Sequence, residues 1–484
     1  MQASALFTDF YELTMAQGYW KLGMNTASVF DMFFRRQPFK GGFSVFAGLE
    51  PLLESIENFR FSKEDIEWLA SVGIFERGFL DYLAEFRFTG DIWAMDEGCI
   101  VFPNEPIIRV HANVIEAAII EGLVLNTINF QSLIATKTAR VWLAARKGSI
   151  MEFGLRRAQG TDGAMSASRA AYIGGAAGTS NALAGKKYGI PVMGTMAHSW
   201  VMSFPSEEMA FDAYAQIYPD KSVFLIDTYN TLDSGIVSAI ASGRKLAAKG
   251  KSFGVRLDSG DIQYLSTEVR KALDDAGCDN ATITVSNELT EEIIESLVLN
   301  QAPIDSWGVG THLVTGGSES SFTGVYKLAA KADGAIVSGV GETQTLRPTM
   351  KLSDNPDKMT NPGVKQVWRL YHEDGSIKAD VLALDDEVIG AGVPTRYFHP
   401  SNDYQNFMFI ASKVQPLLSK KMIAGKRYGT EATLDEIRMR VRSGLEELDR
   451  SYKRILNPHL FKVSLTECLR DLKEEFLMGH RKNG

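Results

Sequence analysis

Apolar residues in the middle of the chain occur in short runs that alternate with longer stretches of helical spacing. Each short run ends in small or polar residues, which is the pattern of a buried strand that reaches the edge of a sheet. These runs predict strands at 150–154, 190–195, 223–228, 253–258, 283–287 and 307–311. The stretches between the later runs predict helices at 207–217, 234–249, 262–276 and 288–300. The central part of the chain is therefore an α/β region.

The spacing of these strands indicates which α/β architecture they form. Successive strands end near residues 195, 227, 258, 287 and 311. That interval of roughly 25–32 residues matches one unit of a β/α barrel, and a doubly wound open sheet has a similar alternation. We favour a β/α barrel because polar residues follow each strand. A barrel brings such residues to one site at the carboxyl ends of its strands.

The flanking regions have a mixed pattern. Before the centre we expect helices at 7–22 and 115–134, strands at 29–34 and 42–49, and short strands within 86–106. After it we expect a connector at 352–363, a hairpin formed by 367–371 and 377–384, and a surface helix at 433–455. The predicted organisation is an N-terminal α/β domain (1–130), a barrel-like domain (131–350) and a C-terminal α+β region (351–484). Part of that last region is expected to pack with the N-terminal domain.

Length and charge narrow the class of protein. With 484 residues, of which 45% are hydrophobic and 23% charged, the chain has the composition of a globular protein with more than one domain. Its net charge of −8 disfavours nucleic acid and anionic membrane surfaces as partners. An anionic ligand would therefore need a local group of cations.

Cysteine usage and the apolar runs indicate the compartment. Cys99, Cys278 and Cys468 are far apart and form no CxxC pair, so neither a zinc cluster nor a disulfide framework is expected. The first residues lack the pattern of a signal peptide, and the apolar run at 114–125 is interrupted by Glu116 and Glu121. We therefore expect a cytoplasmic protein without a membrane span.

Arginines cluster after the first central strand. Arg156 and Arg157 follow the strand at 150–154, and Arg169 lies farther along. Paired guanidinium groups suit the bidentate binding of phosphate, diphosphate or carboxylate. A solvated turn would explain the same residues, but their clustering in an acidic chain favours a binding role.

Acidic residues end two later strands. Asp227 follows the strand at 223–228, and Arg256 and Asp258 lie two residues apart, so their side chains point to the same face of the strand at 253–258. A cation and a carboxylate placed together bind an anionic ligand and either a sugar hydroxyl or Mg²⁺. A structural salt bridge is the alternative.

Glycine-rich segments follow other strands. Residues 308–312 (Gly-Val-Gly-Thr-His) bring Gly310 and Thr311 to a strand end, where glycine lets the backbone approach a phosphate. Residues 178–181 (Gly-Thr-Ser-Asn) are expected to open a helix and to include its N-cap. Together these segments predict a site for a phosphorylated sugar.

One histidine occupies a comparable position. His198 follows the predicted strand at 190–195 and lies among Gly, Thr and Ser residues. An α/β enzyme places a catalytic or covalently modified histidine in such a setting. A structural histidine that completes a turn is the alternative.

Several of these segments together resemble the nicotinate phosphoribosyltransferase family. The matching segments are 8–15 (Thr-Asp-Phe-Tyr-Glu-Leu-Thr-Met), 152–159 (Glu-Phe-Gly-Leu-Arg-Arg-Ala-Gln), 194–199 (Gly-Thr-Met-Ala-His-Ser), 226–230 (Ile-Asp-Thr-Tyr-Asn), 255–261 (Val-Arg-Leu-Asp-Ser-Gly-Asp), 308–311 (Gly-Val-Gly-Thr), 351–353 (Lys-Leu-Ser) and 362–369 (Pro-Gly-Val-Lys-Gln-Val-Trp-Arg). They occur in the order found in the family and cover most of the chain.

The resemblance implies a reaction and an assembly. Nicotinate and phosphoribosyl pyrophosphate would form nicotinate mononucleotide and pyrophosphate in NAD biosynthesis, with ATP as co-substrate and Mg²⁺ as cofactor. His198 would be phosphorylated by ATP. The implied protein is a homodimer with shared active sites, into which Asp9 and Tyr11 would enter from the other subunit.

The resemblance also assigns residues to each ligand. Catalytic roles fall on His198, Arg256 and Asp258. Contacts with nicotinate are expected from Tyr11, Phe153, Ser180, Thr195 and Arg256, with the rings of Phe153 and Tyr11 enclosing the pyridine. Contacts with the phosphoribosyl group and diphosphate are expected from Arg156, Arg157, Asp227, Gly310 and Thr311, with Mg²⁺ on the diphosphate near Asp258.

One position indicates the preferred pyridine. Relatives that use nicotinamide have an aspartate where this chain has Ser180, and an aspartate repels a carboxylate. Serine removes that repulsion and Arg256 holds the nicotinate anion, so the acid is favoured over the amide. A phosphoribosyltransferase for nicotinamide or quinolinate, and a non-catalytic phosphosugar-binding protein, are the alternatives.

Overall fold

The structure is a computed structural model that describes residues 4–146, 148–332, 345–355 and 358–483. The chain divides into two compact units. The first unit comprises residues 1–133 and 321–484, and the second comprises residues 134–320. The second unit is therefore continuous in sequence, whereas the first is built from both ends of the chain.

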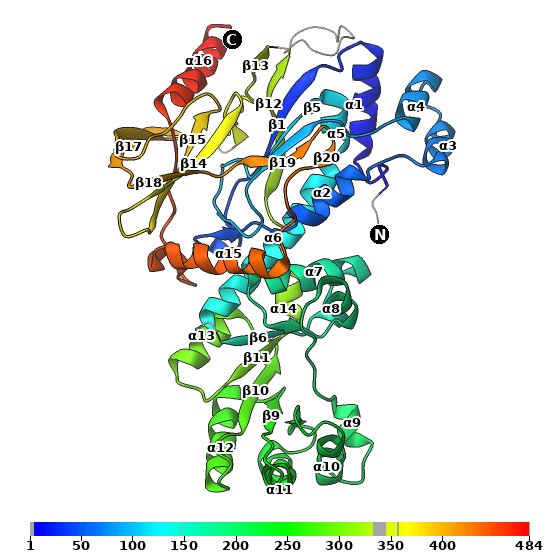
Figure 1. Ribbon diagram of the computed structural model, residues 1–484, viewed down its shortest axis with the longest axis vertical. Helices are drawn as coiled ribbons and strands as arrows, with labels where there is room; N and C mark the ends of the chain where they lie inside the picture. The colour runs from blue at the N-terminus through cyan, green and yellow to red at the C-terminus, as the bar shows by residue number, and fades with distance from the viewer. Residues whose placement is uncertain (1–3, 147, 333–344, 356–357, 484) are drawn as a thin grey trace. The chain divides into compact units, whose positions relative to one another are not determined.

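Among the described residues, the second unit contains a parallel sheet of six strands in the order β7-β6-β11-β10-β9-β8 (Figure 1). Its strands are β6 (Ser149–Glu152), β7 (Gly178–Thr179), β8 (Val223–Leu225), β9 (Gly254–Leu257), β10 (Thr282–Asn287) and β11 (Ser306–Val309). Every neighbouring pair is parallel. The mixed α/β class is confirmed, but this strand order does not establish a closed barrel.

Helices connect the strands of the second unit. They are α7 (Gly160–Gly174), α8 (Ala182–Tyr188), α9 (His198–Met202), α10 (Glu207–Ile217), α11 (Ile236–Ala247), α12 (Ile262–Asp275), α13 (Glu291–Leu299) and α14 (Thr311–Val314). The four helices predicted in this region are confirmed as α10 to α13. Side-chain caps from Ser206, Asp261 and Thr290 begin three of them.

Two expectations for this unit are wrong. Residues 190–195 form no strand apart from an isolated bridge between Thr179 and Val192. Ile190 is buried at 3% exposure, but Val192 is 63% exposed, so the stretch does not continue into the core as a strand would. Residues 178–179 form the short strand β7 rather than the start of a helix, although Asn181 does cap α8 by accepting a hydrogen bond from Ala184 N.

The first unit contains a sheet of seven strands in the order β13-β12-β1-β5-β3-β19-β20. These are β1 (Ala27–Phe34), β3 (Asp91–Ala94), β5 (Ile108–Asn113), β12 (Gly324–Ala332), β13 (Leu346–Pro348), β19 (Ser419–Ile423) and β20 (Lys426–Arg427). The central strand β1 pairs with β5 on one side and with β12 on the other, both antiparallel (Figure 1). Residues 324–332, which the sequence pattern assigned to the central domain, thus belong to this sheet.

The second large sheet of the first unit has six strands, in the order β17-β16-β21-β15-β14-β18. Its strands are β14 (Lys365–Tyr371), β15 (Ile377–Leu384), β16 (Pro394–His399), β17 (Asn402–Ile410), β18 (Lys413–Pro416) and β21 (Val463–Leu465). The predicted hairpin is confirmed as β14 and β15. The expected strand at 42–49 is reduced to β2 (Ser44–Val45), which pairs with β4 (Ile100–Val101).

Helices of the first unit share its apolar core with the strands and loops. They are α1 (Phe10–Lys21), α2 (Leu49–Glu57), α3 (Lys63–Val72), α4 (Arg77–Ala84), α5 (Val114–Ile119), α15 (Leu434–Glu447) and α16 (Glu467–Asn483), and α6 (Glu121–Ala144) contains the boundary between the units. A capping box at Thr433 begins α15, which confirms the predicted C-terminal surface helix. Buried side chains of α1, α2 and α4 pack with those of β1, β3 and β5.

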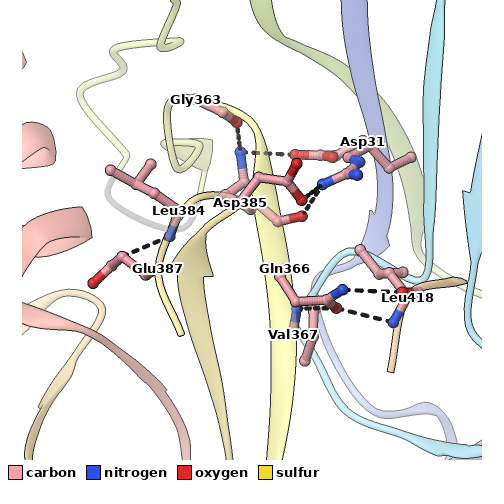
Figure 2. Close-up of polar contacts among 10 residues, drawn as sticks. Asp31, Gly363, Gln366, Val367, Leu384, Asp385, Glu387 and Leu418 are labelled. Carbon is pink, nitrogen blue, oxygen red and sulfur yellow. Dashed lines mark hydrogen bonds and ion pairs between the residues drawn. The ribbon is translucent and has the colours of Figure 1, made fainter. Parts of the chain in front are cut away.

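Buried ion pairs lie within the first unit. The ammonium of Lys365 is 2.8 Å from Asp31 Oδ2 and donates to Gly363 O at 2.5 Å (Figure 2). The guanidinium of Arg109 contacts Asp385 Oδ1 at 2.6 Å. Arg369 donates to both carboxylate oxygens of Asp380, at 2.8 and 2.6 Å. Because each buried cation has a carboxylate partner, these charges are part of the fold.

One helical segment, Val114–Ala144, is long and apolar enough to cross a membrane by length and composition. However, 61% of its most apolar window is buried inside the protein, as in a helix that forms part of a core. This segment is weak support for a membrane span.

Candidate active site

A cavity of about 530 Å³ lies where the strands of the second unit end. Its walls come from the segments that follow β6, β7, β9, β10 and β11, together with the loop before α9. The lining residues are Phe153, Leu155, Arg156, Arg157, Ser180, Gly194, Thr195, Met196, Ala197, His198, Arg256, Asp258, Ser286, Asn287, Glu288, Gly308, Gly310 and Thr311. Ten of the predicted site residues therefore meet at one cavity at the carboxyl ends of parallel strands, where α/β proteins bind ligands.

Two glycines allow the Phe153 ring and its turn to pack closely. A Cβ on Gly308 would lie 2.7 Å from the ring of Phe153, so only a glycine leaves room for that ring against β11. A Cβ on Gly154 would lie 2.2 Å from Val314 of α14. The segment therefore holds an aromatic ring at the wall of the cavity, where a flat heterocycle could stack on it.

Arg256, on β9, is the cation held most deeply in this site. Its guanidinium donates to the hydroxyl of Thr195 and to Met196 O, the latter at 3.1 Å. Burial lowers the pKa of Arg256, while Asp258 and Asp227 act in the opposite direction. These bonds fix the guanidinium against the loop before α9, and a ligand carboxylate in the cavity would find it already oriented.

Asp258 and His198 face each other across the cavity. Oδ1 of Asp258 accepts a hydrogen bond from the hydroxyl of Ser286, and its Oδ2 lies 3.8 Å from His198 Nε2. Nδ1 of His198 lies 3.1 Å from the hydroxyl of Thr228. Because Thr228 engages one ring nitrogen, the other is left on the side of the carboxylate. His198 begins α9 instead of following a strand, which corrects its expected setting.

Asp227 supports the loop behind Asp258. Its Oδ2 accepts hydrogen bonds from Asp258 N at 3.1 Å and from Ser259 Oγ at 2.5 Å. It does not belong to the residues that line the cavity. Arg169 is also away from the lining, because it is 4% exposed within α7. In this geometry Asp227 orients its neighbours.

Three lining residues were missed by the sequence motifs: Ser286, Asn287 and Glu288, at the end of β10. Asn287 has a φ of 148°, a strained conformation for a side-chain-bearing residue. Glu288 accepts a hydrogen bond from Thr311 Oγ1 at 3.2 Å and lies 3.3 Å from His312 Nε2. The signal for them was positional, since β10 is parallel to β9 and ends at the same edge.

Asp9 and Tyr11 lie in the first unit. Asp9 is the N-cap residue of α1, although its side chain makes no capping hydrogen bond, and Tyr11 is 51% exposed on the first turn. Burial of part of its ring, with the nearby carboxylates of Glu121 and Glu12, raises the pKa of Tyr11. Their expected entry into a partner's active site stays a prediction.

The described residues contain no group of three or more His, Cys, Asp or Glu side chains that could hold a metal ion. The cavity does present the carboxylates of Asp258 and Glu288. Mg²⁺ is commonly held by one or two carboxylates together with the phosphates of a substrate. The donor set therefore fits a magnesium ion that arrives with a diphosphate.

These features define an α/β protein whose cavity, at the carboxyl edge of a parallel sheet, is suited to small anionic ligands, with a histidine, two carboxylates and three arginines around it. Comparison with known proteins then specifies the family. Three models match: the nicotinate phosphoribosyltransferase N-terminal domain at 6–129, the family itself at 149–373 and the C-terminal domain at 364–473. The chain belongs to the nicotinate phosphoribosyltransferase family.

Full-length relatives agree with this assignment. The chain is 40% identical over 469 residues to nicotinate phosphoribosyltransferase of Bacillus subtilis, covering 96% of this chain and 93% of the relative. It is 32% identical to the Homo sapiens enzyme of that name, with 99% and 97% covered. The crystal structure of human nicotinic acid phosphoribosyltransferase aligns with a TM-score of 0.83 at 29% identity, covering 97% of this chain and 99% of that one. The predicted family is confirmed.

Proposed function

We propose that this protein transfers the phosphoribosyl group of phosphoribosyl pyrophosphate to nicotinate, releasing pyrophosphate and forming nicotinate mononucleotide for NAD biosynthesis. The observation that carries this proposal is the meeting of Arg256, Asp258, His198 and the two arginines at 156 and 157 around one cavity. In the reaction, the pyridine nitrogen forms a bond to C1 of the ribose while the bond from C1 to the diphosphate oxygen breaks. The protein's task is to align the two reactants and to stabilise the departing charge.

The nicotinate is placed between Phe153 and Arg256 in this proposal. The ring of Phe153 offers a stacking surface, and the guanidinium of Arg256 offers a partner for the carboxylate. Thr195 supports that guanidinium. Ser180 lines the same cavity and carries no negative charge, so it does not repel a carboxylate.

The phosphate groups are assigned to other residues of the lining. Arg156 and Arg157 are exposed at the cavity and suit the diphosphate, and Gly310 and Thr311 suit the 5′-phosphate at the start of α14. Mg²⁺ would neutralise part of the diphosphate charge, with Asp258 beside it. Asp227 holds Asp258 in place through its backbone N–H.

His198 is proposed to couple ATP to the transfer. A ring nitrogen attacks the γ-phosphorus of ATP, ADP leaves, and water later hydrolyses the N–P bond to release phosphate. Thr228 orients the ring for this step. Phosphorylation adds nearly two negative charges, which would draw nearby guanidinium groups toward the histidine and reshape the diphosphate site.

A homodimer with Asp9 and Tyr11 entering the partner's site is also part of the proposal. The support is the exposure of α1 and the residues before it, where Phe7, Phe10, Tyr11 and Met15 are each at least 40% exposed. Exposed aromatic side chains in one segment are typical of a protein interface.

We further propose that the six-stranded sheet of the second unit is an incomplete barrel, since its earliest strand in sequence, β6, pairs with its last strand, β11. We also propose a cytoplasmic location, which the three free cysteines support because thiols stay reduced in that compartment.

Steady-state assays with nicotinate, nicotinamide and quinolinate, each with phosphoribosyl pyrophosphate and with or without ATP, test this function. We expect turnover with nicotinate, stimulated by ATP. Equal turnover with nicotinamide and nicotinate would refute the argument from Ser180.

A second experiment tests His198. Phosphate from γ-labelled ATP should appear on the wild-type chain but not on His198→Ala. If ATP still stimulated the His198→Ala variant, the proposed role of His198 would be overturned. A sensor protein would bind the ligands without forming product.

A further inference from the structure

Glu152, the last residue of β6, has a buried carboxylate that the proposed chemistry does not use. Its side chain is 1% exposed. One oxygen accepts a hydrogen bond from Gly154 N, and the other accepts from Ser168 Oγ at 2.9 Å and Thr179 Oγ1 at 2.5 Å. No described residue forms an ion pair with it. A buried carboxylate held only by neutral donors is costly to replace, because each donor is oriented toward it.

The two hydroxyl groups that donate to Glu152 are themselves held by Asn181. The backbone N–H of Asn181 donates to Thr179 Oγ1 at 2.9 Å, and its side-chain amide donates to Ser168 Oγ at 3.3 Å. Two chains of hydrogen bonds therefore run in one direction, from Asn181 through the hydroxyls to the carboxylate. Such chains polarise and strengthen one another in a dry interior.

The segments joined by this carboxylate carry part of the cavity wall. Phe153 follows Glu152 directly, and the turn at Gly154 leads to Arg156. Ser180 lies between Thr179 and Asn181, and its backbone N–H donates to Glu152 O at 2.8 Å. The ring, the arginine and the serine that contribute to the lining are thus tied to one buried group.

We propose that Glu152 is a positioning residue of the substrate cavity, which fixes the turn bearing Phe153 and Arg156 against the strand bearing Ser180. The proposal rests on the assignment of nicotinate to this cavity. Because Glu152 reaches the ligand only through these neighbours, its loss should affect the fit of the pyridine.

Glu152→Gln is the first test. The amide keeps the size of the side chain, but its NH₂ group cannot accept a hydrogen bond. If the NH₂ faces Gly154, the backbone N–H of Gly154 loses its acceptor; if it faces Ser168 and Thr179, both hydroxyls lose theirs and must turn away. We expect KM for nicotinate to rise about tenfold or more, with a smaller change in kcat. Thr179→Val and Ser168→Ala each remove one donor and should give smaller increases in the same constant.

A matched control is Glu116→Gln in the first unit. Glu116 is 5% exposed and is also held by neutral donors, from Thr89 N at 2.5 Å, Thr89 Oγ1 at 3.0 Å and Asn113 Nδ2 at 3.3 Å. The same change there should lower the unfolding temperature without raising KM for nicotinate. A cavity role thus predicts a KM increase at Glu152 alone, whereas a merely structural role predicts none at either position.

A double-mutant cycle completes the experiment. If the carboxylate acts through Thr179, Glu152→Gln combined with Thr179→Val should be less than additive in KM. A KM for nicotinate equal to that of the wild type in Glu152→Gln would overturn the proposal. If Glu152→Gln does not fold, an unchanged KM in both Thr179→Val and Ser168→Ala would overturn it instead. Wild-type protein that fails to convert nicotinate would instead refute the proposed function, so the two failures are distinguishable.

Discussion

Charged side chains are arranged differently in the second sheet of the first unit and in the cavity of the second unit. Arg369 and Asp380 form a two-bond ion pair in which both side chains are at most 5% exposed. In the cavity, by contrast, the side chains of His198 and Asp258 are 41% and 34% exposed and lie 3.8 Å apart. The first arrangement is complete within the protein, whereas the second leaves bonding capacity for a ligand.

The difference teaches how to separate structural charges from functional ones. Arg369 and Arg256 are both strand residues with an aspartate nearby, so neither local sequence nor residue type distinguishes them. Partner geometry does: Arg369 is matched by a carboxylate, whereas Arg256 donates to a hydroxyl and a carbonyl. Changes at the first residue should therefore affect stability, and changes at the second should affect substrate binding.

The largest effect is expected from Arg369→Met. This change leaves Asp380, which is fully buried, without its cation. Removal of one partner of a buried pair costs about 3–5 kcal/mol of unfolding free energy. Urea unfolding followed by circular dichroism would measure the loss, and adding Asp380→Asn should restore part of it. Unchanged stability in Arg369→Met would break the distinction between the two regions.

Glu12 is an exception in the first unit, because it is 1% exposed and neither of its carboxylate oxygens has a hydrogen-bond partner. Burial, followed by the charge of Glu121, raises the pKa of Glu12 from 4.5 to about 7. Tyr11 and Asp9 on α1 also face it, and Lys327 lies 3.9 Å from Glu121. Between pH 4.5 and 7 the unfolded chain loses this proton while the folded chain keeps it, so stability falls as pH rises through that range.

Glu12→Gln removes this titration. We expect the variant to gain up to about 3 kcal/mol over wild type at pH 8, with the gain vanishing below pH 4.5, because a pKa difference of one unit corresponds to about 1.4 kcal/mol. Thermal unfolding at pH 4.5, 6 and 8 would measure it. A constant difference at all three pH values would show that Glu12 does not titrate in this range.

Arg256→Gln should act on the ligand instead. The loss of a charge-assisted contact to the nicotinate carboxylate is expected to lower kcat/KM about a hundredfold, or about 2.7 kcal/mol. The unfolding temperature should change little, because Arg256 does not neutralise a buried carboxylate. Steady-state kinetics and a thermal melt on the same preparation would decide. A large drop in stability with unchanged kinetics would assign Arg256 to the fold.

The smallest effect is expected from Gly308→Ala. The added methyl group would displace the Phe153 ring, and we expect KM for nicotinate to rise about tenfold, or about 1.4 kcal/mol. Gly194→Ala is the control, since a Cβ on Gly194, which also lines the cavity, meets nothing within 4 Å. Equal KM values for the two variants would argue against a stacking role for Phe153.

The sequence allowed the second unit to be predicted well because its elements are local. Helices α10 to α13 and most strands follow from apolar spacing and from caps such as Asp261. The strand expected at 190–195 did not form because burial stops after Ile190 and Val192 is exposed, which spacing alone does not reveal. The first unit was harder, because β1 pairs with β12 from the far side of the second unit in sequence.

The site was predicted where residues form motifs and missed where only position marks them. Arg256, His198 and Thr311 lie in recognisable segments and line the cavity. Asn287 and Glu288 reach it because β10 ends beside β9, and that depends on strand order. The sequence placed Glu152 in a family motif but did not predict its role, because that role depends on three hydrogen-bond donors from separate segments of the chain.

The pairing of Ser28 with Lys331 also has a consequence during protein synthesis. Ribosomes add about 5–20 residues per second, so β1 emerges roughly 15–60 s before the strand that covers one of its edges. The strands of the second unit, within residues 149–309, are all translated in that interval. Until translation passes residue 332, β1 presents an uncovered apolar edge, which makes the nascent N-terminal segment a natural client for a ribosome-associated chaperone.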